Sequence, residues 1–523
     1  MLLYTLDERF ELDIKKSSGL ILHPTALPSK YGIGDIGNAA FEFVNFLEAT
    51  ETKIWQLLPL GLTSNEEFSP YSSPSSLLGN RYLIDLDNIS DYQPTSSVKE
   101  FDKKSVDFKN VYKFKDQIFY EISQNINIED PIFFELLNDE LIRSHITYLV
   151  LRDKYGLKTW TSWEKDHQEY RDNLFENIAK NDKKLLKFHI FTQFEFFRQW
   201  GKLREYANKK QIQILGDIPI YVNHNSADVW LNKEIFELDS DGEMSFVSGA
   251  VPDSFNKEGQ VWNNCLYQWD RQKLDNYKYW TDKLNKTLDL YNYLRIDHFV
   301  GFFKYWVIKK GDSALKGEWK QGPKSEFFDK ISKNVDLDKL LAEDLGVILK
   351  ETKSLLNKYN IPGMKVLQQR IPDDNEGLPF QGDTDIVNQN KLFEEASDDY
   401  FEEIHPKYWE ENLAAYTGTH DSPTIKQWLN EASKSQIKNF NEYSNKLNNK
   451  FESDIWNFIS LIWESPCKLA ITTVQDLLQL DYKSRFNIPG TTKNNWKWRI
   501  ENMDILNPVI SNLKYINKSN SRN

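Results

Sequence analysis

Eight short apolar segments, most of them separated by intervals long enough for a helix, constrain the fold more than any other feature. Such runs are typical of parallel strands that are buried on both faces. Strands that alternate with helices through right-handed crossovers predict an α/β fold, here a (β/α)8 TIM barrel. The predicted strands are residues 19–22, 54–58, 213–216, 293–296, 340–342, 364–367, 414–417 and 470–474.

Two intervals between these strands are longer than an ordinary connection. Roughly 150 residues separate the second strand from the third, with helical periodicity at 118–126, 139–155 and 184–209. We therefore expect an inserted helical subdomain at 85–190, between barrel parts at 1–84 and 191–510. We expect a polar tail at 511–523, frayed from 517 onward. Residues 221–280 follow the carboxyl end of a strand and carry turn signals, so loop insertions should cover the catalytic face.

Composition and charge exclude several kinds of partner. The net charge of -13 argues against binding to nucleic acid or to an anionic membrane. The sequence contains no apolar run of about 18 residues and no secretory signal at its start. The two cysteines, Cys265 and Cys467, lack metal-ligand spacing. Reduced thiols are typical of a cytoplasmic protein, which is the location that we expect.

Three predicted strands end in a carboxylate that a strand core would not tolerate. Asp297 follows the fourth strand, Glu343 follows the fifth, and Asp421 lies just beyond the seventh. A buried carboxylate without a partner costs several kcal/mol, and the carboxyl ends of barrel strands meet at one face. The three acids therefore predict one shared site, of the kind that glycosidic-bond chemistry requires.

Neighbouring residues allow a functional and a structural interpretation. Arg295 lies two residues before Asp297 and would keep a nucleophilic carboxylate ionised, although a structural ion pair is the alternative. Glu343 beside another carboxylate in a partly apolar mouth would have the raised pKa of a general acid, whereas Glu343 and Asp344 could instead be exposed loop acids. His420 could contact a hydroxyl group, bind a metal or cap a turn. With eight histidines and no H-x-H or H-E-x-x-H pair, we do not expect a catalytic metal.

Ordered motifs between residues 19 and 499 carry a family resemblance. They are SGLILHPTALPS, SPYSSPSSLLGN, GDIPIYV, GQVWNNCLY, LRIDHFVGF, AEDLG, PGMKVLQ, TGTHD, VQDLL, NIPGT and WKWR. With these motifs the sequence resembles the 4-α-glucanotransferases of the amylomaltase (disproportionating enzyme) family, in the α-amylase superfamily. The resemblance implies a transferase that needs no cofactor or metal. Its substrates would be maltooligosaccharides, starch- or glycogen-like α-glucans, and glucose.

The resemblance also implies roles for individual residues. Asp297 matches the nucleophile, Glu343 the acid/base, and Asp421 the carboxylate that stabilises the distorted sugar. Residues 251–262 resemble a loop over the acceptor, in which Ser254 stands where an aromatic residue is usual before Phe255. The substrate-binding positions that we carry over or expect are Tyr71, Asp217, Trp262, Arg295, His420, Ser254 and Phe255.

Two other functions fit part of the pattern. An α-glucan hydrolase on the same barrel would use the same carboxylates but would release reducing ends. A non-catalytic glycan-binding protein would use aromatic side chains, which form 14% of the sequence. Binding alone requires neither a nucleophile nor an acid, so the sequence favours glycosyl transfer with retention, through a covalent glycosyl-enzyme.

Overall fold

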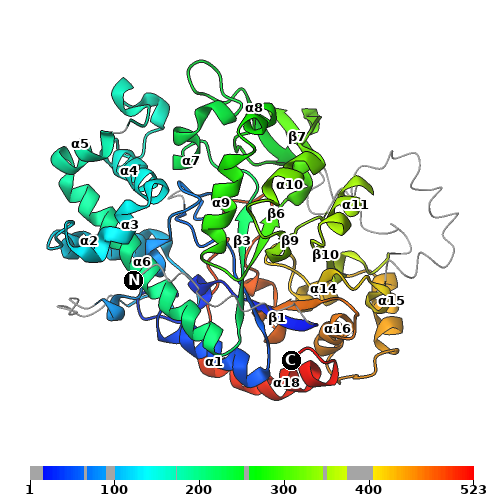
Figure 1. Ribbon diagram of the computed structural model, residues 1–523. Coiled ribbons are helices and arrows are strands. Elements are labelled where there is room, and N and C mark those ends of the chain that lie inside the picture. Colours follow the sequence, from blue (N-terminus) through cyan, green and yellow to red (C-terminus); the bar gives the residue numbers. More distant parts are fainter. Residues whose placement is uncertain are drawn as a thin grey trace.

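A barrel of eight parallel strands lies at the centre of the computed structural model, which describes residues 16–63, 67–89, 100–171, 173–251, 258–345, 350–373 and 405–523 (Figure 1). The strand order is β10-β11-β12-β1-β2-β3-β6-β9. Between the two ends of this order, the Ala342 N–H donates to Pro362 O at 2.9 Å, so the sheet is nearly closed. The predicted barrel is confirmed, and each predicted segment overlaps one strand. These strands are β1 (Ser17–Ile21), β2 (Ile54–Gln56), β3 (Gln213–Pro219), β6 (Tyr293–Asp297), β9 (Leu340–Ala342), β10 (Gly363–Val366), β11 (Leu413–Tyr416) and β12 (Leu469–Thr473).

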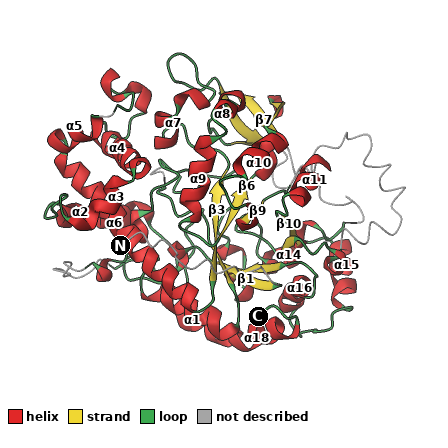
Figure 2. Ribbon diagram, in the orientation of Figure 1, coloured by secondary structure: helices red, strands yellow, loops and turns green. Residues whose placement is uncertain are grey.

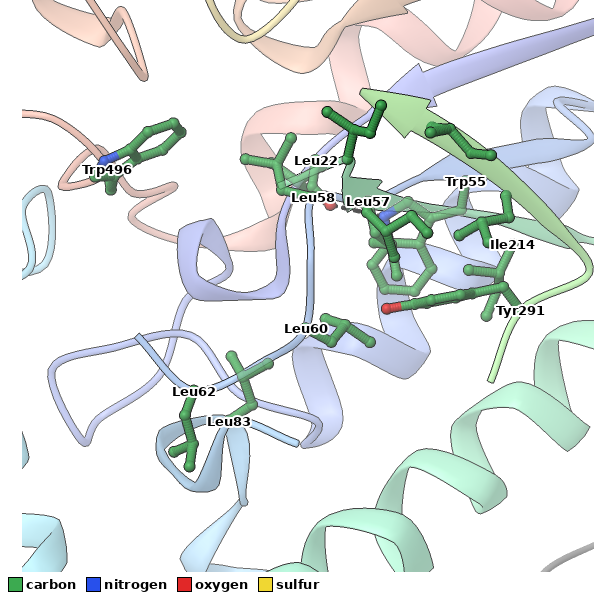
Figure 3. Close-up of a cluster of buried hydrophobic side chains, with 14 of the residues drawn as sticks. Leu22, Trp55, Leu57, Leu58, Leu60, Leu62, Leu83, Ile214, Tyr291 and Trp496 are labelled. Carbon is green, nitrogen blue, oxygen red and sulfur yellow. Dashed lines mark hydrogen bonds between the residues drawn. The ribbon is translucent and has the colours of Figure 1, made fainter. Parts of the chain in front are cut away.

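Successive residues of the barrel strands point alternately inward and outward. Outward residues such as Trp55 and Ile214 belong to the large core beneath the helices, where Figure 3 shows them beside Tyr291. The inward residues form a second cluster, so the barrel interior is packed rather than open. This cluster contains Ile21, Ile54, Leu215, Leu341, Met364, Val366, Ala414, Tyr416, Leu469 and Ile471.

Helices follow most barrel strands and pack their apolar faces against the barrel. In α1 (Asn38–Thr50) the buried residues Ala40, Phe43, Val44 and Leu47 recur at the spacing of one helix face. Among the helices of the described residues, none combines the length and the apolar character that crossing a lipid bilayer requires. Among the described residues, the helices that follow the other strands except β10 are α6 (Lys183–Lys209), α9 (Lys278–Leu288), α10 (Lys324–Ile331), α11 (Lys350–Lys358), α14 (Ile425–Glu431), α15 (Lys434–Ser444), α16 (Asp454–Trp463) and α18 (Ile510–Ser519).

In the described part of the interval between β2 and β3, four further α-helices gather on one side of the barrel (Figure 1). The helices predicted at 139–155 and 184–209 are confirmed as α4 and α6, with ends shifted by one residue. The helix predicted at 118–126 is wrong at both ends. It begins earlier, because the Asp107 side chain accepts from the Asn110 N–H and caps its start, and it ends at Ser123. The four helices are α2 (Phe108–Ser123), α3 (Phe134–Asn138), α4 (Glu140–Lys154) and α5 (Leu174–Asn181).

A second, antiparallel sheet was not predicted. Its order is β5-β4-β7-β8, and Figure 2 shows it as a separate group of strands beside α8 (Trp269–Leu274). Two of its strands come from the interval 221–280 and two follow β6, so no local sequence pattern indicates that they pair. The strands are β4 (Phe246–Ala250), β5 (Gln260–Val261), β7 (Lys304–Lys309) and β8 (Glu318–Gln321), and the short helix α7 (Ala227–Leu231) precedes them.

The carboxyl-terminal segment is ordered, so the prediction of a frayed tail is wrong. Helix α18 continues to Ser519, and the side chain of Arg522 is fully buried at 0% exposure. An arginine has five N–H donors, which here replace solvent for main-chain oxygens at the carboxyl-terminal end of α16, in the turn after it, and at the amino-terminal ends of β1 and β12. The guanidinium donates to the carbonyl oxygens of Trp463 (2.7 Å), Ser465 (2.7 Å), Cys467 (3.0 Å), Ser17 (3.2 Å) and Ile462 (3.4 Å).

We expect Arg522→Ala to lower the free energy of unfolding by about 3 kcal/mol, because buried carbonyl oxygens lose their donors and a cavity remains. Urea unfolding followed by tryptophan fluorescence measures this change. Arg271→Ala, at an exposed position in α8, is the control and should change the free energy by less than about 0.5 kcal/mol. Equal effects of the two substitutions would show that Arg522 does not secure the tail.

Candidate active site

The inner face of the barrel changes from apolar to polar at the carboxyl ends of the strands. Asp217 lies two residues beyond the interior residue Leu215 in β3, so its side chain continues the inward row. Arg295 and Asp297 share one side of β6 in the same way. The β3–β6 register pairs Asp217 with Arg295, and Glu343 follows β9, the other neighbour of β6. These polar groups therefore converge at one barrel mouth.

Arg295 joins two of the carboxylates. Its Nη1 donates to Asp217 Oδ2 at 2.6 Å and its Nη2 donates to Asp297 Oδ1 at 2.8 Å. Burial alone would lower the pKa of the Arg295 guanidinium, but Asp217 and Asp297 raise it well above its usual range. The side chain of Asp297 is 30% exposed, whereas that of Asp217 is 0% exposed. Asp297 thus combines contact with a permanent cation and access from the mouth.

Glu343 is buried close to these groups. Its Oε2 accepts from the His298 N–H at 2.7 Å and its Oε1 accepts from the Leu345 N–H at 3.0 Å. Burial, and then the negative charge of Asp297, raise the pKa of Glu343 to about 8, although Arg295 and the His298 N–H act in the opposite direction. Glu343 therefore carries a proton at neutral pH, as a general acid must.

The adjacent acid, Asp344, points elsewhere. Its Oδ1 accepts from the Met364 N–H at 2.7 Å, at the start of β10. A Cβ added to Gly363 would lie 2.7 Å from Asp344 Oδ2, so the carboxyl group occupies the narrow space between β9 and β10. Asp344 helps to close the barrel there, which leaves Glu343 as the acid that faces the site.

Tyr71, His420 and Asp421 form a second chain of contacts. The Tyr71 hydroxyl donates to Asp217 Oδ2 at 2.6 Å and lies 2.9 Å from His420 Nε2. The same Nε2 lies 3.2 Å from Asp421 Oδ2. Burial alone would raise the pKa of Asp421, but His420 and the Asn487 amide lower it to about 2. Asp421 therefore remains negatively charged across the physiological pH range.

The structure places most of the predicted site residues together. Trp262, after β5, lies against His298, with ring centroids 4.7 Å apart, and so stands near Glu343. Ser254 and Phe255 lie outside the described residues. Within the described ranges, no group of three or more His, Cys, Asp or Glu side chains could hold a metal ion. The residues that the contacts link are Tyr71, Asp217, Arg295, Asp297, His420 and Asp421. Glu343 lies close enough for the charge of Asp297 to raise its pKa.

Three contacting residues were missed by the sequence analysis. Asn487 Nδ2 donates to Asp421 Oδ1 at 2.5 Å, and Arg485 Nη2 donates to the main-chain oxygen of Asp421 at 2.6 Å. The ring of Trp496 lies 6.0 Å from that of His420. All three come from the chain after β12 and follow no strand end. The motifs NIPGT and WKWR, which contain Asn487 and Trp496, were the available signal.

One family model matches the chain over most of its length, at residues 22–505, and its description is 4-alpha-glucanotransferase. The 4-alpha-glucanotransferase of Clostridium butyricum is 35% identical over 508 residues, which cover 94% of this chain and 98% of that protein. That of Aquifex aeolicus is 35% identical over 495 residues, which cover 92% and 95%. The structure of amylomaltase from Streptococcus agalactiae in complex with acarbose matches with a TM-score of 0.84 and 31% identity, covering 97% of this chain and all (100%) of that chain.

Proposed function

The chain belongs to the 4-α-glucanotransferase family and is a transferase that acts on α-1,4-glucans, and we propose that it works by a retaining double displacement at the barrel mouth. It passes a segment of an α-1,4-glucan to the 4-hydroxyl of an acceptor glucan or of glucose. One observation carries this mechanism. Asp297, in contact with the Arg295 guanidinium, lies near Glu343, whose pKa is raised to about 8.

In the first step, Glu343 gives its proton to the leaving 4-oxygen while Asp297 attacks the anomeric carbon. The glycosidic bond breaks, an ester bond to Asp297 forms, and the shortened glucan leaves with the proton. Asp421, with its pKa near 2, supplies a lasting negative charge beside the positive charge that develops on the sugar. Tyr71, Asp217, Arg295 and His420 hold the sugar and the carboxylates in place.

In the second step, the 4-hydroxyl of an acceptor replaces the departed glucan. Glu343, now ionised, takes the proton of this hydroxyl, whose oxygen attacks the anomeric carbon and breaks the ester to Asp297. Two inversions give net retention. Transfer exceeds hydrolysis when bound sugar excludes water from the ester. Trp262, beside His298, would contact the acceptor, and Ser254 and Phe255 remain predictions for the same side.

We expect maltotriose alone to give glucose and a series of longer maltooligosaccharides at a constant total of reducing ends, because transfer preserves the number of glycosidic bonds. Chromatography of all products, together with a reducing-end assay, measures this result. The Asp297→Asn chain is the matched control. A rise in reducing ends in step with the loss of maltotriose would favour the α-glucan hydrolase. Binding of glucan with no conversion at all would favour a glycan-binding protein.

We also propose a cytoplasmic location. Cys265 and Cys467 are both free and buried, and burial raises the pKa of each thiol, which leaves unreactive thiols that suit a reducing compartment. Fractionation of the native cells with an antibody to the chain tests this location. Recovery of the protein mainly outside the cytoplasmic fraction would contradict it.

A further inference from the structure

The segment 485–499, which we call the 485–499 loop, contacts the proposed site from the chain after β12. Its Arg485 donates to the main-chain oxygen of Asp421. The Asn487 N–H donates to the main-chain oxygen of His420 at 3.1 Å. The ring of Trp496 lies beside that of His420. The loop therefore contacts both His420 and Asp421, although it supplies none of the groups assigned to the chemistry.

Trp496 lies against two site residues at once. Its ring centroid is 6.0 Å from that of Tyr71 and 6.0 Å from that of His420, at interplanar angles of 45° and 38°. Tyr71 and His420 are themselves stacked, at 5.4 Å and 16°. These distances are in the range of favourable aromatic pairs. Phe486 packs on Trp496 at 5.6 Å, and Trp496 is only 6% exposed. The tryptophan is thus a buried support for the Tyr71–His420 stack.

The backbone of Trp496 is held in an unfavourable conformation. Its φ of 66° lies in the left-handed region, which a bulky L-residue adopts only when its surroundings enforce it. The Trp496 N–H donates to Phe486 O at 2.6 Å. The preceding Asn495 accepts from the Ile488 N–H and donates to Thr491 O. These hydrogen bonds fold the loop back on itself and fix the position of the Trp496 indole.

The end of the loop is fixed to the segment that follows β1 and to Asp102, which lies between β2 and β3. Arg499 is 3% exposed, and its guanidinium donates to Ser29 O at 2.8 Å, to Asp102 O at 3.0 Å and to Leu27 O at 3.4 Å. The following N–H, of Ile500, donates to Ala26 O at 2.8 Å. These contacts are made within the protein, so they fix the position of the loop without a bound sugar.

We propose that Trp496 is a positioning residue, which fixes the ring of His420 and thereby the contacts of Tyr71 and Asp421. His420 Nε2 faces both Tyr71 and Asp421, so a rotation of the imidazole would disturb both contacts. Within the described part of the chain, His420 Nδ1 has no hydrogen-bond partner, so ring packing restrains the rotation. The inference rests on the proposed function, because it concerns the same site. A misplacement of about 1 Å at such a site costs roughly a hundredfold in rate.

Trp496→Leu tests this role, with Trp498→Leu as the matched control. Trp498 lies two residues further along, is half-buried, and pairs through its backbone with Ser105, which is not one of the proposed site residues. The measurement is the rate of glycosyl-enzyme formation from an activated glycosyl fluoride, which needs no acid. We expect Trp496→Leu to lower this rate about thirtyfold and Trp498→Leu to lower it less than about threefold. Labelling of Trp496→Leu at the wild-type rate would overturn the inference.

Two further variants separate positioning from a loss of stability. Trp496→Phe keeps a ring and should recover the labelling rate to within about fivefold of wild type. Trp496→Met keeps much of the volume without a ring, and it decides the question if the leucine variant does not fold. A methionine variant that labels as fast as wild type would overturn the inference.

The ring of His420 gives a readout that does not depend on catalysis. Its NMR resonance can be assigned by its loss in His420→Gln, and it should move in Trp496→Leu but not in Trp498→Leu. An unmoved resonance in Trp496→Leu would overturn the inference even if the wild type is active. A wild-type chain that neither labels nor converts maltotriose would instead overturn the proposed function, whatever the resonance does.

Discussion

Asp297→Asn is expected to reduce the conversion of maltotriose by at least about a thousandfold while glucan binding is retained. The amide is nearly isosteric with the carboxylate but is a poor nucleophile, so the glycosyl-enzyme cannot form. The substitution also removes one of the two carboxylates that face the Arg295 guanidinium. Asp217 remains as a partner of that guanidinium, so the barrel mouth should keep its shape.

Three properties are measured: conversion by product analysis with maltotriose, glucan binding by calorimetric titration with a longer maltooligosaccharide, and folding by a thermal melt. Asp270→Asn is the control, because Asp270 is exposed in the first turn of α8. It should leave all three properties within a factor of two of wild type, as is usual for a surface substitution. Conversion by Asp297→Asn at more than about a tenth of the wild-type rate would contradict its assignment as the nucleophile.

Glu343→Gln should lose about a thousandfold in the conversion of maltotriose, yet it should still be labelled by an activated glycosyl fluoride. Fluoride leaves without protonation, so the first step with this donor does not need the acid. Glu318→Gln, at an exposed position in β8, is the control and should behave as wild type with both donors. Failure of the fluoride to label folded Glu343→Gln at Asp297 would contradict the assigned roles.

The pH dependence of the wild-type enzyme follows from the same carboxyl group. Because the pKa of Glu343 is raised to about 8, the proton that the proposed mechanism requires is present at neutral pH. The rate of the first step with maltotriose should therefore fall as the pH rises through about 8, and labelling by the fluoride should lack this fall. A fall in this rate near pH 4.5, the ordinary pKa of a glutamate, would contradict the assignment of Glu343 as the general acid.

The stability of the folded chain should change with pH in the same direction as the rate of the first step. Between the ordinary pKa of 4.5 and about 8, folded Glu343 holds a proton that the unfolded chain has lost. The free energy of unfolding should therefore decline across this pH window, because the charged form must be desolvated in the folded state. Glu343→Gln should remove this part of the decline. Urea unfolding of both chains at a series of pH values checks the expectation.

Sequence patterns predicted those elements that neighbouring residues encode, such as the barrel strands. The apolar runs that became β3 and β6 end in Asp217 and Asp297, and the two-residue period of a strand places these acids in the inward rows. The antiparallel sheet was missed, because β4 pairs with β7, which lies beyond a barrel strand. The buried state of Arg522 was missed for the same reason, since its partners lie more than fifty residues away.

The sequence by itself determined the barrel and its family, because apolar runs, strand ends and ordered motifs are properties of neighbouring residues. The sequence left Glu343 either as a general acid with a raised pKa or as an exposed loop acid, and only the tertiary structure decided which carboxyl group holds a proton. Glu343 and Asp421 both lie near strand ends, yet burial beside Asp297 raises the pKa of the first to about 8. His420 and Asn487 lower the pKa of the second to about 2. A pKa depends on desolvation and on charges brought from other strands, and these exist only once the barrel has closed.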